Sequence, residues 1–181
     1  VYDESGKPIE GLYEDLNRDG TISDADRYYF NQASPNYLFG VNTSVTYKKF
    51  SLGLAGHGMA GNYLYNNYNS NSAVLRNIQN PVLHLGNAGV NYLQTLFTNN
   101  RFQSDYYIEN ASFFRIDNIN LGYNVGRIAQ GVKLRLNASV QNVATFTKYS
   151  GNDPENASAE GIDNNIYPRP RIYSIGANLD F

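Results

Sequence analysis

Hydrophobic and polar residues alternate along five separate stretches of the chain: 37–47, 50–57, 113–125, 132–143 and 171–181. Successive side chains of a β-strand point to opposite faces, so each stretch is expected to form a strand with one apolar and one polar face. In the last stretch, Tyr173, Ile175 and Leu179 share a face, whereas the other face is mostly small or polar. The pattern therefore predicts an all-β fold.

The length and contrast of these stretches favour strands that cross a bilayer. A tilted transmembrane strand takes about 9–11 residues, which 171–181 supplies. In 132–143, a purely aliphatic face lies opposite a face of charged and amide side chains, a pattern that needs no soluble core. A strand of a soluble sandwich can alternate in the same way, so that alternative stays open. The final aromatic residue, Phe181, ends an edge that we expect to be paired in a barrel.

The connections between the expected strands alternate in length. The short turns are 48–49 and 126–131, and the long loops are 1–36, 58–112 and 144–170. Outer-membrane barrels have short periplasmic turns and long extracellular loops, so the long loops are expected outside the cell. Five strands cannot close a barrel, and we therefore expect them to complete a larger sheet. The alternation slips near Ile116, which predicts a β-bulge there.

Composition narrows the class of protein without deciding it. The net charge of −2 gives no sign of a nucleic-acid partner, and the absence of cysteine excludes disulfides and cysteine metal sites. The 16 tyrosines and 9 phenylalanines suit the aromatic belts of a barrel. No nucleophile motif such as G-x-S-x-G is present, and the sequence indicates no enzyme.

One segment carries a metal-binding pattern. The stretch from Asp15 to Asp26 follows the D-x-N-x-D-G spacing of a calcium loop. In such a loop, positions one, three and five supply side-chain oxygens, position seven a backbone carbonyl and position twelve a carboxylate. The expected ligands are Asp15, Asn17, Asp19, Thr21 and Asp26. A solvated acidic turn without an ion is the alternative, and we expect a structural rather than a catalytic Ca²⁺.

Two weaker candidates complete the list of possible sites. Tyr63, Tyr65 and Tyr68 lie among asparagines and are candidates for stacking on sugars, although a loop packed by its own tyrosines is the slightly favoured alternative. His57 and His84 are the only histidines, and a two-histidine metal site is the less favoured reading of them.

Several stretches together resemble the C-terminal part of the SusC/RagA family of TonB-linked outer-membrane proteins. The acidic segment Asp15–Ile22 resembles the family's D-x-N-x-D-G loop, and Ser104–Tyr123 resembles its strand-opening signature. The segments Ser139–Val143, Lys148–Glu155 and Tyr167–Arg171 follow in the family's order. The likeness extends over most of the chain.

This resemblance implies the last five strands of a transmembrane antiparallel barrel of about 22 strands, with the N-terminal plug and the earlier strands absent from this chain. Residues 1–36 would form an extracellular loop, and 37–181 the strands with the long extracellular loops 58–112 and 144–170. It further implies the bacterial outer membrane, uptake of glycans, oligosaccharides or peptides powered through TonB, and a SusD-like surface lipoprotein as a lid.

Two hypotheses follow from the sequence. The first is a segment of a TonB-dependent transporter whose aliphatic strand faces touch lipid. The second is a secreted, calcium-dependent all-β binding or adhesion module, in which a second packed sheet covers those faces. The surroundings of the aliphatic faces of 113–125 and 132–143 distinguish the two.

Overall fold

The computed structural model describes residues 1–79, 82, 86–155, 157 and 160–181. The long strands are β1 (Tyr37–Tyr47), β2 (Phe50–Ala60), β5 (Phe113–Ala129), β6 (Val132–Thr147) and β8 (Ile172–Asp180). The short elements are β3 (Tyr63–Asn66), β4 (Ile108–Asn110), β7 (Ile162–Asp163), α1 (Asn67–Ser72), α2 (Leu75–Ile78), α3 (Tyr92–Thr95) and the 3₁₀ turns η1 (Asp24–Asp26) and η2 (Asp105–Tyr107). Among the described residues, no helix combines the length and the apolar character that a membrane span requires.

The chain divides into two units, and each is described by itself. Unit 1 consists of Val1–Ser34, Tyr63–Asn110 and Tyr149–Ile166. Unit 2 consists of Pro35–Asn62, Ala111–Lys148 and Tyr167–Phe181, and it contains the five long strands.

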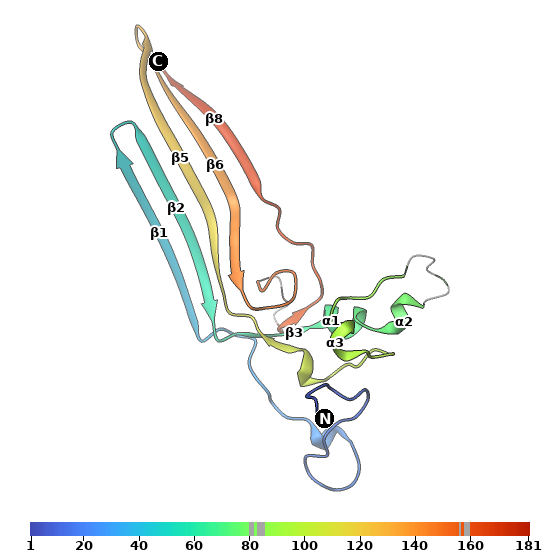
Figure 1. Cartoon of the computed structure of the whole chain (residues 1–181). Coiled ribbons are helices and arrows are strands. Elements are labelled where there is room, and N and C mark those ends of the chain that lie inside the picture. Colours follow the sequence, from blue (N-terminus) through green and yellow to red (C-terminus); the bar gives the residue numbers. More distant parts are fainter. Residues whose placement is uncertain (80–81, 83–85, 156, 158–159) are drawn as a thin grey trace. The chain divides into compact units, whose positions relative to one another are not determined.

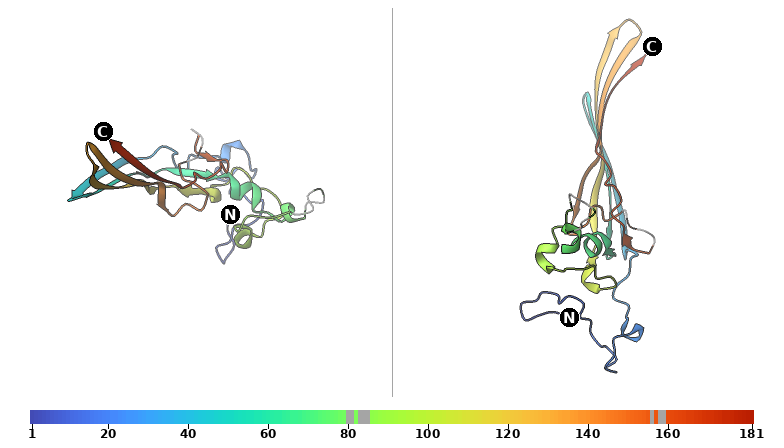
Figure 2. Two further views of the ribbon diagram at one scale, coloured as in Figure 1. Left: turned by 90° about the horizontal axis from the view of Figure 1, so that it is seen from above. Right: turned by 90° about the vertical axis from the view of Figure 1, so that its right-hand side faces the viewer.

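The five long strands of unit 2 form one antiparallel sheet in the order β1-β2-β5-β6-β8 (Figure 1). Two further views show the strands lying side by side in a twisted sheet (Figure 2). Tyr47 pairs with Phe50 across a tight turn, and Ala129 pairs with Val132 across a second one. The predicted all-β sheet is therefore confirmed, and within the described residues it is open rather than closed into a barrel.

The second turn is shorter than the 126–131 turn that the sequence suggested. The β5–β6 ladder continues through two register shifts, one before Gly126 and one before Ala129. Gly126 has a φ of 99°, a conformation that side-chain-bearing residues rarely adopt, and it keeps the two strands paired beyond the predicted end.

The apolar face of this sheet, which we call the outer face, has no cover in the described chain. Val41, Leu52, Leu121, Leu136 and Ile175 are between 42 and 91% exposed. A β-sandwich would bury such residues against a second sheet about 10 Å away. The structure thus lacks the second packed sheet that the hypothesis of a soluble module requires of these strands, as far as the described residues go.

The regular pairing of the neighbouring strands β2, β5 and β6 is interrupted at the same position along their length. Asp117 is an extra residue of β5 between Ile116 and Asn118, which confirms the predicted bulge. On β6, Asn142 adopts a φ of 53° at the same level, and its Nδ2 donates hydrogen bonds to the carbonyls of Arg169 and Pro170. This amide fixes the segment that enters β8.

Unit 1 has a small core of its own. Leu64, Val74, Phe97 and Tyr107 are buried, and β3 lies between β4 and β7 in a three-stranded sheet. Buried polar side chains hold the loops together. Asn66, which is fully buried, donates from Nδ2 to Glu109 Oε1 at 2.9 Å and to Ser150 Oγ at 3.0 Å. These bonds connect three segments that are far apart in the sequence.

Candidate functional site

The acidic loop at 15–26 is tightly folded around its own carboxylates. Asp15 accepts hydrogen bonds from the backbone N–H groups of Arg18, Asp19 and Gly20, with distances of 2.7 to 3.3 Å. Gly20 has a φ of 84°, as the turn position of a calcium loop requires. Asp26 accepts from the N–H of Ser23 at 2.7 Å and of Leu16 at 3.0 Å, so it reaches back across the loop.

Backbone hydrogen bonds stabilise the ionised carboxylates of this loop. The N–H groups of Ser23, Asn17 and Leu16, the first of them most strongly, lower the pKa of Asp26 below its usual value. Asp19 accepts from Thr21 N and Asn17 Nδ2, so the side chains at positions three and five meet each other. Across the described residues, no three His, Asp or Glu side chains are placed to hold a metal ion. The oxygen donors suit Ca²⁺ in kind, and the calcium site stays a prediction.

The three candidate sugar-binding tyrosines lie in different settings. Tyr65 packs edge-on against Tyr107, with ring centroids 6.1 Å apart, and burial raises its pKa. Tyr63 is half-buried on β3, and Tyr68 is exposed on α1, with its ring beside Gly89. The structure therefore gives Tyr65 a packing role inside unit 1. A sugar-binding role for Tyr63, Tyr65 and Tyr68 stays a prediction.

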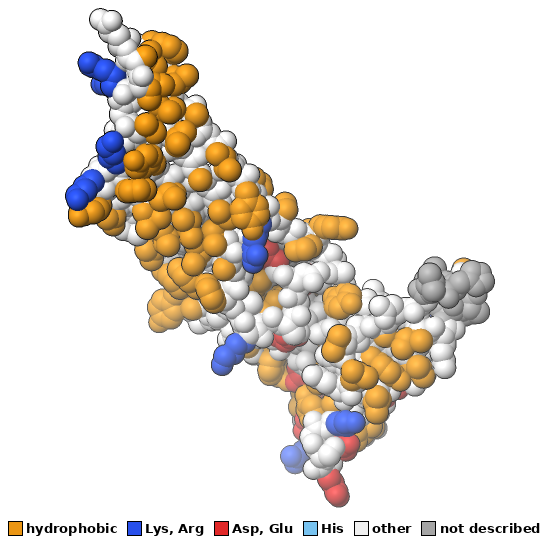
Figure 3. All heavy atoms as spheres, turned by 45° about the horizontal axis from the view of Figure 1, so that its top comes forward, with side chains coloured by type: hydrophobic (Ala, Val, Ile, Leu, Met, Phe, Trp, Pro, Cys, Tyr) orange, Lys and Arg blue, Asp and Glu red, His pale blue; other side chains and the backbone are white. Residues whose placement is uncertain are grey.

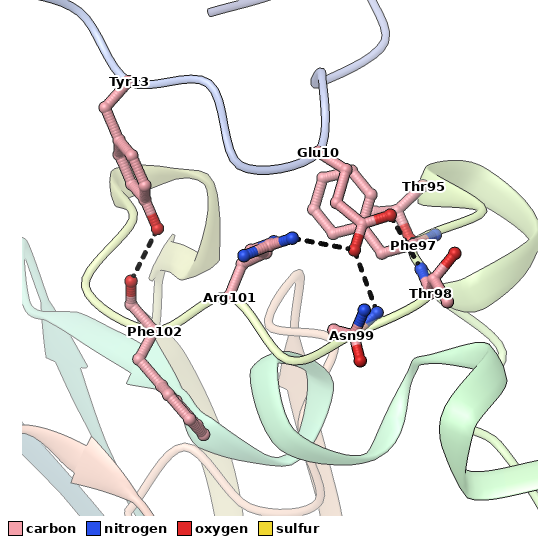
Figure 4. Close-up of polar contacts among 8 residues, drawn as sticks. All are labelled: Glu10, Tyr13, Thr95, Phe97, Thr98, Asn99, Arg101 and Phe102. Carbon is pink, nitrogen blue, oxygen red and sulfur yellow. Dashed lines mark hydrogen bonds and ion pairs between the residues drawn. The ribbon is translucent and has the colours of Figure 1, made fainter.

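Glu10 forms a polar clamp that the sequence did not reveal. Its two carboxylate oxygens accept from the N–H groups of Thr98 and Asn99, both at 2.9 Å, and Oε1 also pairs with Arg101 Nη2 at 3.1 Å (Figure 4). The Tyr13 hydroxyl donates to the carbonyl of Phe102 beside it. The clamp fastens residues 10–13 to the segment 98–102. Partners 88 to 91 residues away leave no local signal in the sequence.

A second polar cluster lies on the polar face of the sheet, which we call the inner face. His57 Nδ1 lies 2.7 Å from Asp117 Oδ2, and the His57 ring packs edge-on against Phe113. The Arg115 guanidinium lies 5.5 Å from the centroid of the same Phe113 ring. The bulge at Asp117 turns this carboxylate toward His57. His84 lies outside the described residues, so the two-histidine site has no test here.

Below this cluster, the inner face carries small and amide side chains. Strand alternation and pairing register place these residues on it: Gly40, Asn42, Ser44 and Thr46 of β1, Ser51, Gly53 and Ala55 of β2, Asn118, Asn120, Gly122 and Asn124 of β5, Asn137, Ser139 and Gln141 of β6, and Ser174, Gly176 and Asn178 of β8. We call this set the inner strip. Arg135 of β6 stands in register between Asn124 and Asn178, so the inner face carries a positive charge at this position.

The outer face is bounded by two aromatic rows. Phe39, Phe114 and Phe146 stack across the sheet with centroid separations of 6.1 and 6.5 Å. The rings of Phe39 and Phe114 lie over Gly58 and Gly56, where an added Cβ would meet them. At the other end, Phe50 and Tyr123 lie 4.7 Å apart. Hydrophobic side chains cover much of the sheet on the side that Figure 3 shows.

The spacing of these rows comes close to the height of the apolar layer of a membrane. From Phe39 to Tyr47 along β1, the rise of about 3.4 Å per residue gives roughly 27 Å of strand, or about 19–22 Å along the membrane normal at a tilt of about 35–45°. Outer-membrane barrels have an apolar band about 25 Å tall between two aromatic girdles. The outer face therefore has the dimensions and side chains of a lipid-facing surface.

Comparisons with known proteins agree with these observations. No family model matches the chain. It is 38% identical over 191 residues to the TonB-dependent receptor SusC of Bacteroides thetaiotaomicron, covering all of this chain and 18% of that protein. A TonB-dependent receptor of Formosa agariphila is 28% identical over 192 residues, covering 94% of this chain and 19% of that protein.

Solved structures show the same fold. The RagAB peptide importer in its 'open-open' state matches 94% of this chain and 20% of the other with a TM-score of 0.67 at 21% identity. Its 'closed-closed' state matches all of this chain with a TM-score of 0.65 at 22% identity. The chain thus spans about a fifth of the length of the relatives it matches.

Proposed function

The chain belongs to the SusC/RagA family of TonB-dependent outer-membrane proteins, and from that premise we propose that it forms part of the wall of an outer-membrane transporter. The observation that supports this most strongly is the sheet of unit 2. One face is apolar, exposed and bounded by aromatic rows, and the other face is polar. A sheet of this kind needs a cover for its apolar face, and in an outer-membrane barrel lipid supplies that cover.

The cargo and the partners form the finer part of the proposal. We propose that the whole protein imports glycans, oligosaccharides or peptides, with energy supplied through TonB and with a SusD-like surface lipoprotein closing the extracellular side. The name of one relative contains "TonB-dependent receptor", and the matched RagAB structures are described as a peptide importer. These words apply to those proteins, and they motivate the same class of activity for this one.

Uptake by the full-length protein tests the proposal. A strain that lacks the full-length protein should lose uptake of at least one labelled oligosaccharide or peptide, and the wild-type gene should restore it. Affinity purification of the full-length protein in detergent should recover a surface lipoprotein in near-equal amount. Unchanged uptake of every cargo, together with the protein in the secreted fraction, would contradict the proposal and favour the soluble binding module.

We also propose that the acidic loop of unit 1 binds one structural Ca²⁺ through Asp15, Asn17, Asp19, the carbonyl of Thr21, and Asp26. The donor types and the left-handed Gly20 support this assignment. Bound calcium would replace backbone N–H groups as the partner of these oxygens and would order the loop. It takes no part in transport chemistry in this proposal.

A further inference from the structure

The turn between β1 and β2 consists of two lysines, at a place where tight hairpin turns prefer asparagine and glycine. Lys48 adopts a φ of 54°, a left-handed conformation that a lysine rarely takes. Asparagine or glycine would fit this backbone better, so the turn residue is not explained by the needs of the turn. A residue in an unfavourable backbone conformation at such a place is a candidate for function through its side chain.

Both lysine side chains are held at the turn end of the outer face. The Lys48 ammonium lies 5.3 Å from the centroid of the Tyr47 ring, and Tyr47 is 67% exposed on that face. Lys49 Nζ donates to the carbonyl of Val125 at 3.2 Å, which fixes the second side chain on the neighbouring strand β5. The two positive charges therefore lie next to the aromatic row that bounds the outer face at this end.

The described chain does not balance these two charges. Neither lysine forms an ion pair with any described residue. The acidic residue of unit 2 at the turn end, Asp180, belongs to the inner face, where it stands in register with Lys133. Unit 2 contains nine Lys and Arg residues and two Asp residues, although the net charge of the whole chain is −2. The border of the outer face thus offers a positive site to an external anion.

The surroundings of the turn indicate which kind of anion fits. A lysine stem can lie along apolar surface while its ammonium reaches the headgroup layer, and tyrosine prefers the boundary between the two. A zwitterionic headgroup carries its own cation beside the phosphate and gains little from a lysine. An anionic headgroup has no such cation, and one lysine near the membrane surface favours it by about fivefold.

We infer that Lys48, Lys49 and Tyr47 form a site for an anionic phospholipid, whose phosphate contacts the two ammonium groups while its acyl chains lie along the outer face. The inference rests on the proposed place of this sheet in a transporter wall, and it adds the class of lipid and the residues that select it. Because the short turns of outer-membrane barrels face the periplasm, the lipid belongs to the periplasmic leaflet.

The test places the full-length protein in vesicles with equal amounts of phosphatidylglycerol and phosphatidylcholine, one of which carries bromine on its acyl chains. Val45→Trp supplies a reporter on the outer face, because Val45 is two residues from Tyr47 on β1 and 60% exposed. The reporter signal is the difference in fluorescence between the proteins with and without this substitution. Bromine quenches tryptophan on contact, so the ratio of the two quenching efficiencies reports which lipid lies beside the turn.

Brominated phosphatidylglycerol should quench the reporter about fivefold more effectively than brominated phosphatidylcholine at low salt. About 1 M NaCl should remove most of this preference, since it screens charges beyond about 3 Å. Lys48→Asn, which suits the left-handed backbone, should lower the preference severalfold, and Lys48→Asn with Lys49→Gln should abolish it. Lys48→Arg, which keeps the charge, and Lys133→Gln, which removes a charge from the inner face, are the controls that should preserve it.

The outcomes separate this inference from the function on which it rests. Equal quenching by the two brominated lipids, or a preference that survives high salt or the double substitution, overturns the inference and leaves the transporter wall in place. Inorganic phosphate added at constant ionic strength should leave the preference unchanged. Loss of the preference would mean that the turn binds free phosphate, and the lipid site would be wrong. Absence of quenching by either lipid means that the outer face does not contact lipid and that the proposed function has failed.

Discussion

Each of the two units of this chain is stabilised in a different way. Unit 1 buries Val74, Tyr107, Asn66 and Asp163 almost completely, and the two polar side chains among them, Asn66 and Asp163, find hydrogen-bond partners in its own loops. Unit 2 leaves the aliphatic side chains of its sheet largely exposed. The first gains its free energy of folding from contacts within the described chain. The second depends on surroundings that the chain does not supply.

The network around Tyr149 shows how unit 1 manages polar groups in its interior. The Tyr149 hydroxyl donates to Asp163 Oδ2 at 2.7 Å, and Asp163 Oδ1 accepts from the N–H of Asn165. Burial, together with the hydrogen bond to Asp163, raises the pKa of Tyr149. The phenol therefore stays protonated and donates to the carboxylate at physiological pH. Partners of this kind offset the cost of burying Asp163 in unit 1.

The largest effect is expected in the core of unit 1. Tyr107→Ala removes a buried ring that packs against Tyr65 and Tyr106, and it should cost about 3–5 kcal/mol of stability. Limited proteolysis of the full-length protein in detergent should show faster cleavage within unit 1. Tyr29→Ala is the control, because Tyr29 is fully exposed in the same unit. Equal protection of the two variants would contradict the self-contained core.

The next effect concerns the lipid-facing side of unit 2. Leu136→Arg places a charge on the outer face and should cost about 2–4 kcal/mol if the residue lies near the middle of the bilayer. The fraction of full-length protein that folds into membranes should fall accordingly. Asn137→Arg, one residue along and on the inner face, should insert far better. Equal insertion of both variants would show that the two faces do not differ in their surroundings.

A smaller effect, confined to one loop of unit 1, is expected from calcium. An ion at a free concentration 100 times its dissociation constant would stabilise the ordered loop by about 2.7 kcal/mol. Calcium should slow proteolytic cleavage between residues 15 and 26, and Asp19→Ala should abolish this protection. Asp24→Ala is the matched control, since Asp24 lies in the loop but pairs with Arg27 outside the ligand positions. Protection that persists in Asp19→Ala would refute the assignment.

The smallest effect is a pH dependence in unit 1. The hydrogen bond from the Tyr28 hydroxyl to Asp105, aided by burial, raises the pKa of Tyr28 to about 12. The unfolded phenol ionises near pH 10, so this contribution to stability is complete below about pH 10 and is lost as the pH rises toward 12. Several tyrosines, Tyr149 among them, should titrate late in phenolate absorbance, and Asp105→Asn should return one of them to the normal range. An unchanged titration curve in that variant would exclude the contact.

The strands could be predicted from the sequence because alternation is a local signal. In β6 from Val132 to Gln141, the apolar or polar character of each residue predicts which face of the sheet it occupies. The break in this alternation near Ile116 likewise predicted the bulge. The end of the β5–β6 hairpin could not be predicted, because Gly126 resembles a turn residue whether or not its neighbours remain paired.

The sites of unit 1 were harder to predict than the strands of unit 2. The calcium pattern and the tyrosine cluster are contiguous in sequence and therefore visible. The Glu10 clamp and the buried Asn66 network depend on partners that fold back from distant segments. The pairing of His57 with Asp117 depends on a bulge that turns one carboxylate out of the alternation. Such contacts arise only once the topology is formed.

The open sheet also has a consequence for how this polypeptide is made. In the described chain, β1 pairs only with β2 and β8 pairs only with β6, so each leaves one row of backbone donors and acceptors available along its length. In water, two unpaired edges (the borders of the sheet) next to an exposed apolar face would promote edge-to-edge aggregation into fibres. If this sheet is part of a larger barrel, as we propose, biogenesis must keep both borders from pairing with other nascent chains until the neighbouring strands are in place.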